Sequence, residues 1–269
     1  MRKLNLLMKI VTINLTLILV SCSKSDSSDS TYAHFVEVKT GGVGGVYFID
    51  ADGIRLNPTL ESIIRLESSN VSFADGVSYI QYTVVSDDSS ISGSKTGPFT
   101  INLFAATSID RNFANTDDMH FNDFAPTAPI VSLSGTLESN GNIHVMNNRY
   151  LILEVNYFIG LTSNGKANPH DFTIVYNSDE TSAGSTNLKL HLSHYSNGDT
   201  ALEYQSIQLI QLDLSLFYMA FDLNSAINHF KSVTGKNEFQ ISLMTDIASE
   251  YYQTISDAEQ KEYLYNYKP

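Results

Sequence analysis

The clearest structural signal in this 269-residue chain is the segment Leu151-Ile-Leu-Glu-Val-Asn-Tyr-Phe-Ile159. Every second residue, from Leu151 to Ile159, is apolar, whereas Glu154 and Asn156 interrupt the alternate series. Side chains along a strand point to opposite faces in turn, so this pattern predicts a β-strand with one face buried in a core.

The same period of two recurs on both sides of this segment. It appears in residues 79–84, 99–105, 131–134, 172–176, 188–192 and 239–243. Turn signals separate such runs at Asp52-Gly53, Asp75-Gly76, Asn140-Gly141, Asn164-Gly165 and Asn197-Gly198. Between residues 207 and 214 the alternation changes phase, which predicts a β-bulge. The sequence therefore predicts an all-β, mostly antiparallel protein.

Helical signals are few. Residues 222–230 are compatible with one short helix. Ser256-Asp-Ala-Glu259 fits a capping box, in which a serine and a glutamate three residues later satisfy the first backbone N–H groups of a helix. We therefore expect a C-terminal helix that runs through Tyr265.

About eleven strands would be unusual in one closed sheet, so we expect two domains. Residues 112–129 show little periodicity and resemble a connecting segment. Placing the boundary after the strand that follows gives a first domain over residues 35–138 and a second over residues 139–269. Five or six strands suit a small barrel, and six to eight suit a sandwich.

The first 22 residues have the pattern of a secretory signal peptide. Arg2, Lys3 and Lys9 form a basic start, and an apolar run follows. Only 14 uncharged residues lie between Lys9 and Lys24, whereas a membrane-spanning helix needs about 20.

Leu19-Val-Ser-Cys22 resembles the lipobox of bacterial lipoproteins. The resemblance implies cleavage before Cys22 and lipid attachment to its thiol, and two acyl chains suffice for stable membrane anchoring. A buried structural cysteine is the alternative. Residues 23–34 then form a polar tether, and Ser23 resembles the sorting residue of outer-membrane lipoproteins in Gram-negative bacteria.

Charge limits the partners of the chain. The full sequence has 16 basic and 29 acidic residues, and the part from Cys22 onward has a net charge of −16. A protein with this negative charge repels nucleic acids and anionic membrane surfaces. We therefore expect no nucleic-acid partner. The single cysteine excludes an internal disulfide bond.

Two groups of residues suggest metal binding. His191 and His194 lie three apart, but on a strand their side chains diverge, so we expect a buried His194 hydrogen-bonded to backbone. Asp117, Asp118, His120 and Asp123 could bind a divalent cation or could merely form turns. The group Asn168-Pro-His-Asp171 is a weaker candidate, and Asp50-Ala-Asp-Gly53 fits a hairpin turn better than a calcium loop.

No segment predicts catalysis or a cofactor. Ser92-Gly-Ser-Lys95 matches S-x-x-K, but its glycine and serine-rich surroundings do not suit the helix that this motif requires. Thr40-Gly-Gly-Val-Gly-Gly45 lacks the Lys and Ser/Thr of a phosphate-binding loop. Tyr79 and Phe104 are the clearest candidates for exposed aromatic side chains. We expect no catalytic residues and no cofactor.

Four segments resemble the NigD-like lipoprotein family. They are the hairpin element with D-G-x-x-L-x-P at residues 46–58, and the strand segments 142–157, 170–176 and 188–199. The resemblance implies an N-terminal OB-like domain and a C-terminal antiparallel β-sandwich. It implies no catalytic residues, and the family is named for a proposed role in bacteriocin immunity. Ser193 departs from the arginine that usually precedes the strand histidine.

Together these observations predict a non-catalytic lipoprotein at the cell surface or on the periplasmic side of the outer membrane. It would bind a polypeptide or glycan, with bacteriocin immunity as one version. A structural or adaptor subunit of an outer-membrane assembly is the first alternative, and an envelope hydrolase is the second.

Overall fold

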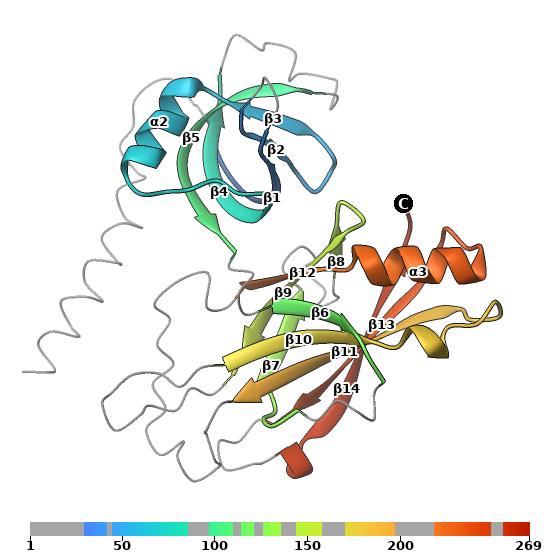
Figure 1. Cartoon of the computed structure of the whole chain (residues 1–269). Helices are drawn as coiled ribbons and strands as arrows, with labels where there is room; N and C mark the ends of the chain where they lie inside the picture. The colour runs from blue at the N-terminus through green and yellow to red at the C-terminus, as the bar shows by residue number, and fades with distance from the viewer. Residues whose placement is uncertain are drawn as a thin grey trace, which may run out of the picture.

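The computed structural model describes residues 30–41, 45–85, 97–109, 114–120, 126–135, 144–157, 170–196, 218–248 and 255–269. Two bodies make up this part of the chain, a small barrel and a larger body of two sheets below it (Figure 1). Within the described residues, no helix is long and apolar enough to cross a membrane.

The barrel has five strands. They are β1 (Thr31–Lys39), β2 (Tyr47–Ile49), β3 (Arg55–Pro58), β4 (Gly76–Val84) and β5 (Phe99–Ser108), and they close in the order β1-β2-β3-β5-β4. Every second side chain points inward, so Val36 and Val38 of β1 meet Ile80 of β4 and Leu103 of β5 in one core. A helix between β3 and β4 and this strand order make the barrel OB-like.

Helix α2 (Leu60–Ser68) was not predicted from the sequence. Thr59 caps it by accepting a hydrogen bond from the backbone N–H of Ser62. Only Ser62 and Leu66 are buried, whereas Leu60 and Ile64 are exposed. The buried face thus combines a serine with Leu66, while two other apolar residues face solvent, so the sequence of α2 does not show a clear apolar stripe.

The second body is a β-sandwich with one core between its sheets. The first sheet has the order β14-β13-β11-β10-β6, and the second has the order β12-β9-β7 with β8 beside β9. The strands are β6 (Ala114–Asp118), β7 (Ser132–Gly135), β8 (His144–Met146), β9 (Tyr150–Asn156), β10 (His170–Tyr176), β11 (Asn187–Ser196), β12 (Tyr218–Asp222), β13 (Phe239–Ile247) and β14 (Glu259–Tyr267). Leu151, Leu153 and Val155 of β9 lie in the core, as their alternation predicts.

Short helical segments complete the sandwich. Helix α3 (Asn224–Thr234) confirms the short helix expected near residues 222–230, with Ile227 and Phe230 buried. It ends at Gly235, whose φ of 68° is the left-handed conformation that glycine adopts readily. Two 3-10 turns are η3 (Ser178–Glu180) and η6 (Ile255–Asp257).

The all-β class, with a barrel followed by a sandwich, is confirmed. The first sandwich sheet is mixed rather than antiparallel, because β6 runs parallel to β10 and β11 runs parallel to β13. Strands that pair in parallel need long connections, and both pairs are formed by segments far apart in the chain.

Two boundaries differ from the sequence prediction. Strands β6 and β7 pair with β10 and β9, so they belong to the sandwich, and the barrel ends at Ser108 rather than near residue 138. Strand β6 was taken for a connection because its sequence, Ala-Asn-Thr-Asp-Asp, has no apolar alternation. At the other end, β1 includes residues 31–34, which were assigned to the tether.

The predicted C-terminal helix is wrong. Residues 259–267 form β14, which pairs antiparallel with all nine residues of β13. Tyr263, Tyr265 and Tyr267 alternate toward the sandwich core, a period that suits a strand. The capping-box residues coincide only with the short turn η6.

Several predictions fall outside the described residues. They are lipid attachment at Cys22, the S-x-x-K match at residues 92–95, Asp123, the phase change at residues 207–214 and the turns at Asn140, Asn164 and Asn197.

Candidate binding site at the domain junction

An apolar cluster joins the barrel to the sandwich. Phe35 on the outer face of β1 lies with its ring centroid 5.1 Å from that of Tyr218 on β12, in an edge-to-face arrangement. Tyr79 packs on the other side of Phe35, also at 5.1 Å. Buried Met146 and Ile152 complete the contact from the sandwich. Burial of these side chains holds the two bodies together.

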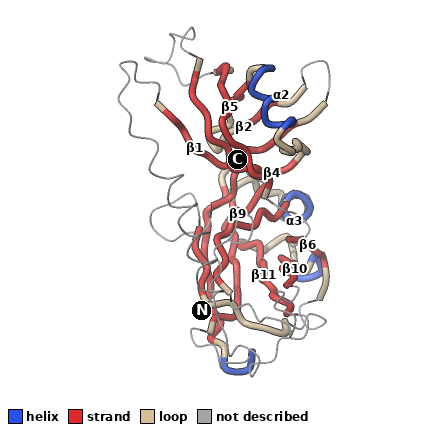
Figure 2. The backbone as a smooth tube through the Cα atoms, turned by 90° about the vertical axis from the view of Figure 1, so that its left-hand side faces the viewer, coloured by secondary structure: helices blue, strands red, loops and turns tan. Residues whose placement is uncertain are grey.

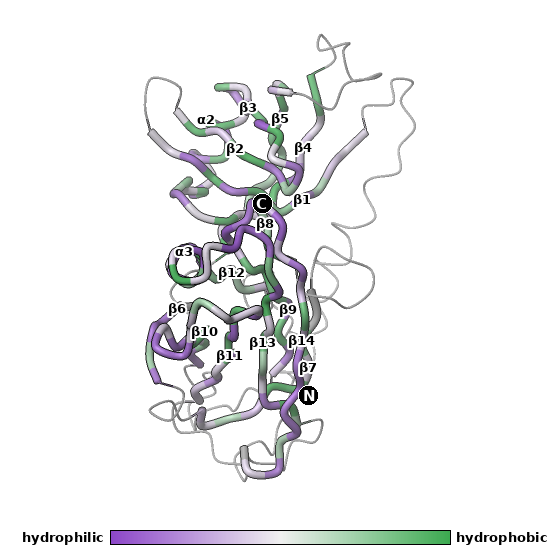
Figure 3. The backbone as a smooth tube through the Cα atoms, turned by 90° about the vertical axis from the view of Figure 1, so that its right-hand side faces the viewer, coloured by the Kyte–Doolittle hydropathy of each residue, from purple (hydrophilic) through white to green (hydrophobic). Residues whose placement is uncertain are grey.

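A tight hairpin between β8 and β9 places polar groups beside this cluster. Asn147 and Asn148 have φ angles of 50° and 55°. The N–H of Arg149 donates to the carbonyl of Met146 at 3.0 Å. Two successive positive φ angles define a type I′ turn, and asparagine tolerates them better than most residues. Figure 3 shows this turn as a hydrophilic segment next to the C-terminal end of the chain.

Glu37 of β1 is the centre of the polar contacts across the junction. It is 5% exposed. Its carboxylate lies 2.6 Å from Lys39 Nζ and 3.6 Å from Arg149 Nη1, and it accepts a hydrogen bond from Asn147 Nδ2 at 3.3 Å. The hydrogen bond that Lys39 donates to the Glu37 carboxylate raises the pKa of Lys39. The Glu37 carboxylate therefore has three side-chain partners, from both bodies.

Arg149 ties this network to the sandwich. Its Nε donates to both carboxylate oxygens of Asp222 at 3.0 Å, and its guanidinium carbon lies 4.7 Å from the Tyr150 ring centroid. Hydrogen bonding to Asp222 raises the pKa of Arg149 further. Planar, multiply bonded Arg–carboxylate pairs are geometrically specific, so this pair, which lies within the sandwich, fixes the guanidinium that contacts Glu37 of the barrel.

A pocket of about 430 Å³ opens beside this network and is lined by both bodies. The barrel contributes Glu37, Ile49 and the turn residues 51–53, and the sandwich contributes Val145, Asn147, Asn148, Tyr265 and Lys268. Figures 1 and 2 show the C-terminal end of the chain between the barrel and the sandwich. The volume lies within the range of ligand pockets, and a site between domains is a common place for one.

Asp50 fixes the barrel side of the pocket. Its carboxylate accepts hydrogen bonds from the N–H groups of Asp52 and Ile54, at 3.0 and 2.8 Å. Gly53, with a φ of 77°, closes the turn. The hairpin turn predicted for residues 50–53 is confirmed, and it holds Ala51 and Asp52 at the pocket rim.

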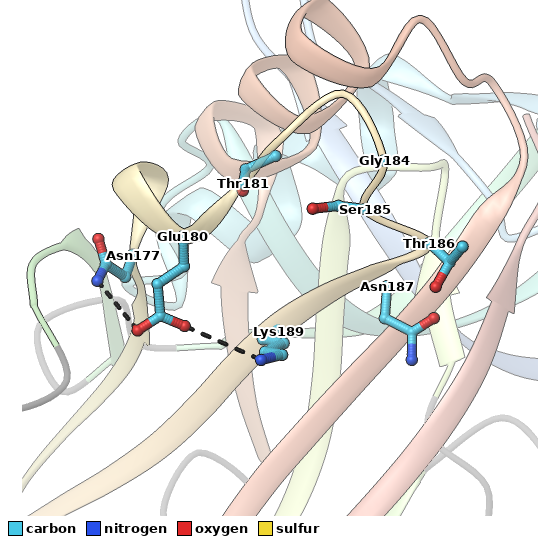
Figure 4. A pocket seen from close by; sticks show the side chains of 8 residues that line it. All are labelled: Asn177, Glu180, Thr181, Gly184, Ser185, Thr186, Asn187 and Lys189. Atoms are coloured by element: carbon cyan, nitrogen blue, oxygen red, sulfur yellow. Dashed lines mark hydrogen bonds and ion pairs between the residues drawn. The ribbon is translucent and has the colours of Figure 1, made fainter.

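A second, smaller pocket of about 250 Å³ lies around η3 and the start of β11 (Figure 4), at the same end of the first sandwich sheet as the end of β14. Its charged groups already pair with one another, since Glu180 accepts from Asn177 at 3.3 Å and lies 4.0 Å from Lys189. Its lining includes no aromatic side chain. The junction pocket, with an aromatic group and residues from both bodies, is the better candidate site.

His170 and His194 form a buried pair. The sequence predicts the burial of His194 but not its contact with His170. His194 is 2% exposed and its Nδ1 lies 3.1 Å from the Pro129 carbonyl, which confirms the expected backbone partner. Its Nε2 lies 2.9 Å from Nδ1 of His170. A carbonyl only accepts, so His194 Nδ1 donates to Pro129 and His194 Nε2 accepts from His170. Burial, then His170, lowers the pKa of His194 to about 3.

The other side chains proposed as metal ligands do not form a common site. His191 faces Asp246 at 3.6 Å, away from His194, as its strand position predicts. Asp118 accepts from the Ser178 N–H at 2.9 Å, and His120 lies 3.6 Å from Asp179. Among the described residues, no three His, Cys, Asp or Glu side chains are grouped as a metal site would require.

Sequence reasoning missed the residues that build the junction pocket. Glu37, Asn147 and Arg149 carry no motif, and their partners lie far away in the chain. The Asn147-Asn148 pair was a usable signal, since adjacent asparagines between two strands indicate a type I′ turn. Of the two proposed exposed aromatic residues, Phe104 is 47% exposed, whereas Tyr79 packs in the junction.

No family model matches the chain, and neither does any curated protein. Solved structures do. A candidate lipoprotein from Bacteroides fragilis aligns over 89% of this chain and 99% of its own, with a TM-score of 0.63 and 21% identity. A candidate toxin-related protein from Parabacteroides distasonis aligns over 89% and 94%, with a TM-score of 0.55 and 14% identity. A NigD-like immunity protein from Bacteroides caccae aligns over 89% and 99%, with a TM-score of 0.49 and 15% identity.

The first two likenesses extend over both bodies, so the succession of barrel and sandwich is shared with them. The chain thus shares its fold with a candidate lipoprotein from Bacteroides fragilis and a candidate toxin-related protein from Parabacteroides distasonis.

Proposed function

We propose that this protein is a NigD-like, non-catalytic lipoprotein of the cell envelope that binds a polypeptide or glycan ligand in its junction pocket. The observation that carries the proposal is the pocket itself, which exists only because barrel and sandwich are held together. Its buried carboxylate, Glu37, is engaged by Lys39 and Arg149, an arrangement suited to fixing a shape rather than to moving protons. A bacteriocin as ligand is the version suggested by the family resemblance.

The anchor in this proposal is a lipid on Cys22, at the outer membrane. It is supported by the lipobox at residues 19–22 and by the fold shared with a candidate lipoprotein. The acidic body would be repelled by anionic head groups, so membrane association depends on the lipid. Replacing Cys22 by Ala is expected to release the protein from the membrane fraction. Retention of the variant in that fraction would refute the lipid anchor.

Retention of envelope components by the immobilised mature protein tests the pocket. Ala51 is exposed at the rim, so Ala51→Trp is expected to fill the opening without disturbing a core. Thr181→Trp in the second pocket is the matched control. We expect the native protein and T181W to retain a glycan or polypeptide that A51W loses. Equal retention by all three proteins, or none by the native protein, would overturn the proposal.

An adaptor subunit of an envelope assembly is the second candidate, because α2 presents Leu60 and Ile64 at 74% and 56% exposure. Solitary apolar residues are common at surfaces, but two on one helix face suit a protein contact. Purification of the native lipidated protein would recover a stoichiometric partner if this version holds, and a monomer alone would refute it.

A further inference from the structure

We infer that the junction pocket recognises an uncharged saccharide unit of a glycan, an inference that rests on the proposed function of this pocket. The lining combines one aromatic side chain, Tyr265, with the amides of Asn147 and Asn148. Its three charged groups are Glu37, Asp52 and Lys268. An amide donates and accepts hydrogen bonds, as a sugar hydroxyl does. An aromatic ring offers an apolar face on which the C–H face of a sugar ring can lie.

Charge around the pocket is balanced, although the protein as a whole is acidic. Glu37 and Asp222 are paired with Lys39 and Arg149. The remaining rim charges, Asp52 and Lys268, have opposite signs. An ionic ligand would find no net attraction here, and an acidic one would be repelled by the surrounding surface. This favours a neutral ligand.

The shape of the site favours a compact ligand. Extended peptides are recognised along open sheet edges or apolar grooves, whereas this site is a shallow, partly polar hollow of about 430 Å³ between two bodies. The β8–β9 turn places Asn147 and Asn148 in the pocket lining, where Nδ2 of Asn147 already donates to Glu37. The amide of Asn148 and the amide oxygen of Asn147 can pair with hydroxyl groups of a sugar ring.

The experiment is an array of neutral oligosaccharides, acidic oligosaccharides and peptides, followed by calorimetric titration of the strongest neutral hit. The test variant is Asn148→Gly, which removes one amide but keeps the left-handed turn, because glycine adopts positive φ freely. We expect N148G to bind about tenfold more weakly, as loss of one well-placed hydrogen bond would cause. The variant T181W, in the second pocket, should bind the oligosaccharide as the native protein does.

The outcomes separate this inference from the proposed function. A neutral oligosaccharide that binds the native protein but not A51W supports both. An acidic glycan or a peptide that A51W loses would overturn the saccharide inference and leave the pocket as a binding site. A hit that binds A51W and N148G as strongly as the native protein would overturn both. If no oligosaccharide or peptide binds, the saccharide inference is refuted. The retention of envelope components by the native protein and A51W would then still test whether the pocket binds a ligand.

Discussion

At the scale of single residues, Arg149 has the most consequential contacts in the described structure. It joins Glu37 of the barrel to Asp222 of the sandwich and lies over Tyr150. Its side chain is 35% exposed, so solvent screens part of the interaction. The hydrogen bonds, rather than charge attraction alone, account for its contribution.

Arg149→Met is expected to lower the free energy of unfolding by about 1 to 3 kcal/mol, since it removes the hydrogen bonds to Asp222 and the cation beside Glu37. Arg55, which lies over Tyr47 on the barrel surface, provides the control. Arg55→Met should change the free energy by about 0.5 kcal/mol or less. Urea unfolding of both variants checks this, and equal effects would contradict the assigned role of Arg149.

His194 makes stability depend on pH. Its pKa is about 3 in the folded protein and about 6.5 when unfolded. Below pH 6.5 the unfolded chain binds a proton that the folded protein excludes, so stability falls as pH decreases by about 1.4 kcal/mol per unit. Above this range the contribution is constant.

Urea unfolding at about pH 7.5, 6.5 and 5.5 measures that slope. His194→Gln is expected to flatten it, whereas His120→Gln at an exposed position should not. An unchanged slope in H194Q would show that His194 is not the group responsible.

At the scale of elements, the turn between β8 and β9 depends on residues that tolerate positive φ. Asn148→Ala is expected to destabilise the protein by about 1 kcal/mol, because a β-carbon disfavours the left-handed conformation. Asn148→Gly should be neutral or stabilising. Thermal unfolding of the two variants tests this, and a more stable alanine variant would contradict the turn geometry.

The sequence predicts the strands whose apolar residues alternate regularly. It does not predict the elements in which such alternation is missing or is masked by another local pattern. Strand β9 is recognisable because its apolar row faces one core. Strand β6 is almost entirely polar, and α2 buries Ser62 and Leu66 while Leu60 and Ile64 are exposed. In β14, tyrosines on the inward face were outweighed by a local capping pattern that forms only one turn. The sequence does not predict the junction pocket, because its residues come together only through tertiary packing.

At the scale of the whole molecule, the junction makes the barrel and the sandwich one cooperative unit. Phe35 is 7% exposed and lies between Tyr79 and Tyr218. Phe35→Ala is expected to cost about 3 to 5 kcal/mol and to divide unfolding into two transitions. Phe35→Leu keeps most of the apolar contact and should preserve one transition. Calorimetry checks this, and two transitions in the native protein would contradict coupling of the two bodies.

The barrel and the sandwich together form one ligand site. Hydrogen exchange of the protein, measured with and without a bound neutral oligosaccharide, tests whether both bodies contact the ligand. The account predicts simultaneous protection of residues 49–53 in the barrel and of residues 145–148 and 265–268 in the sandwich. Protection confined to one body, or centred on residues 177–189, would contradict it.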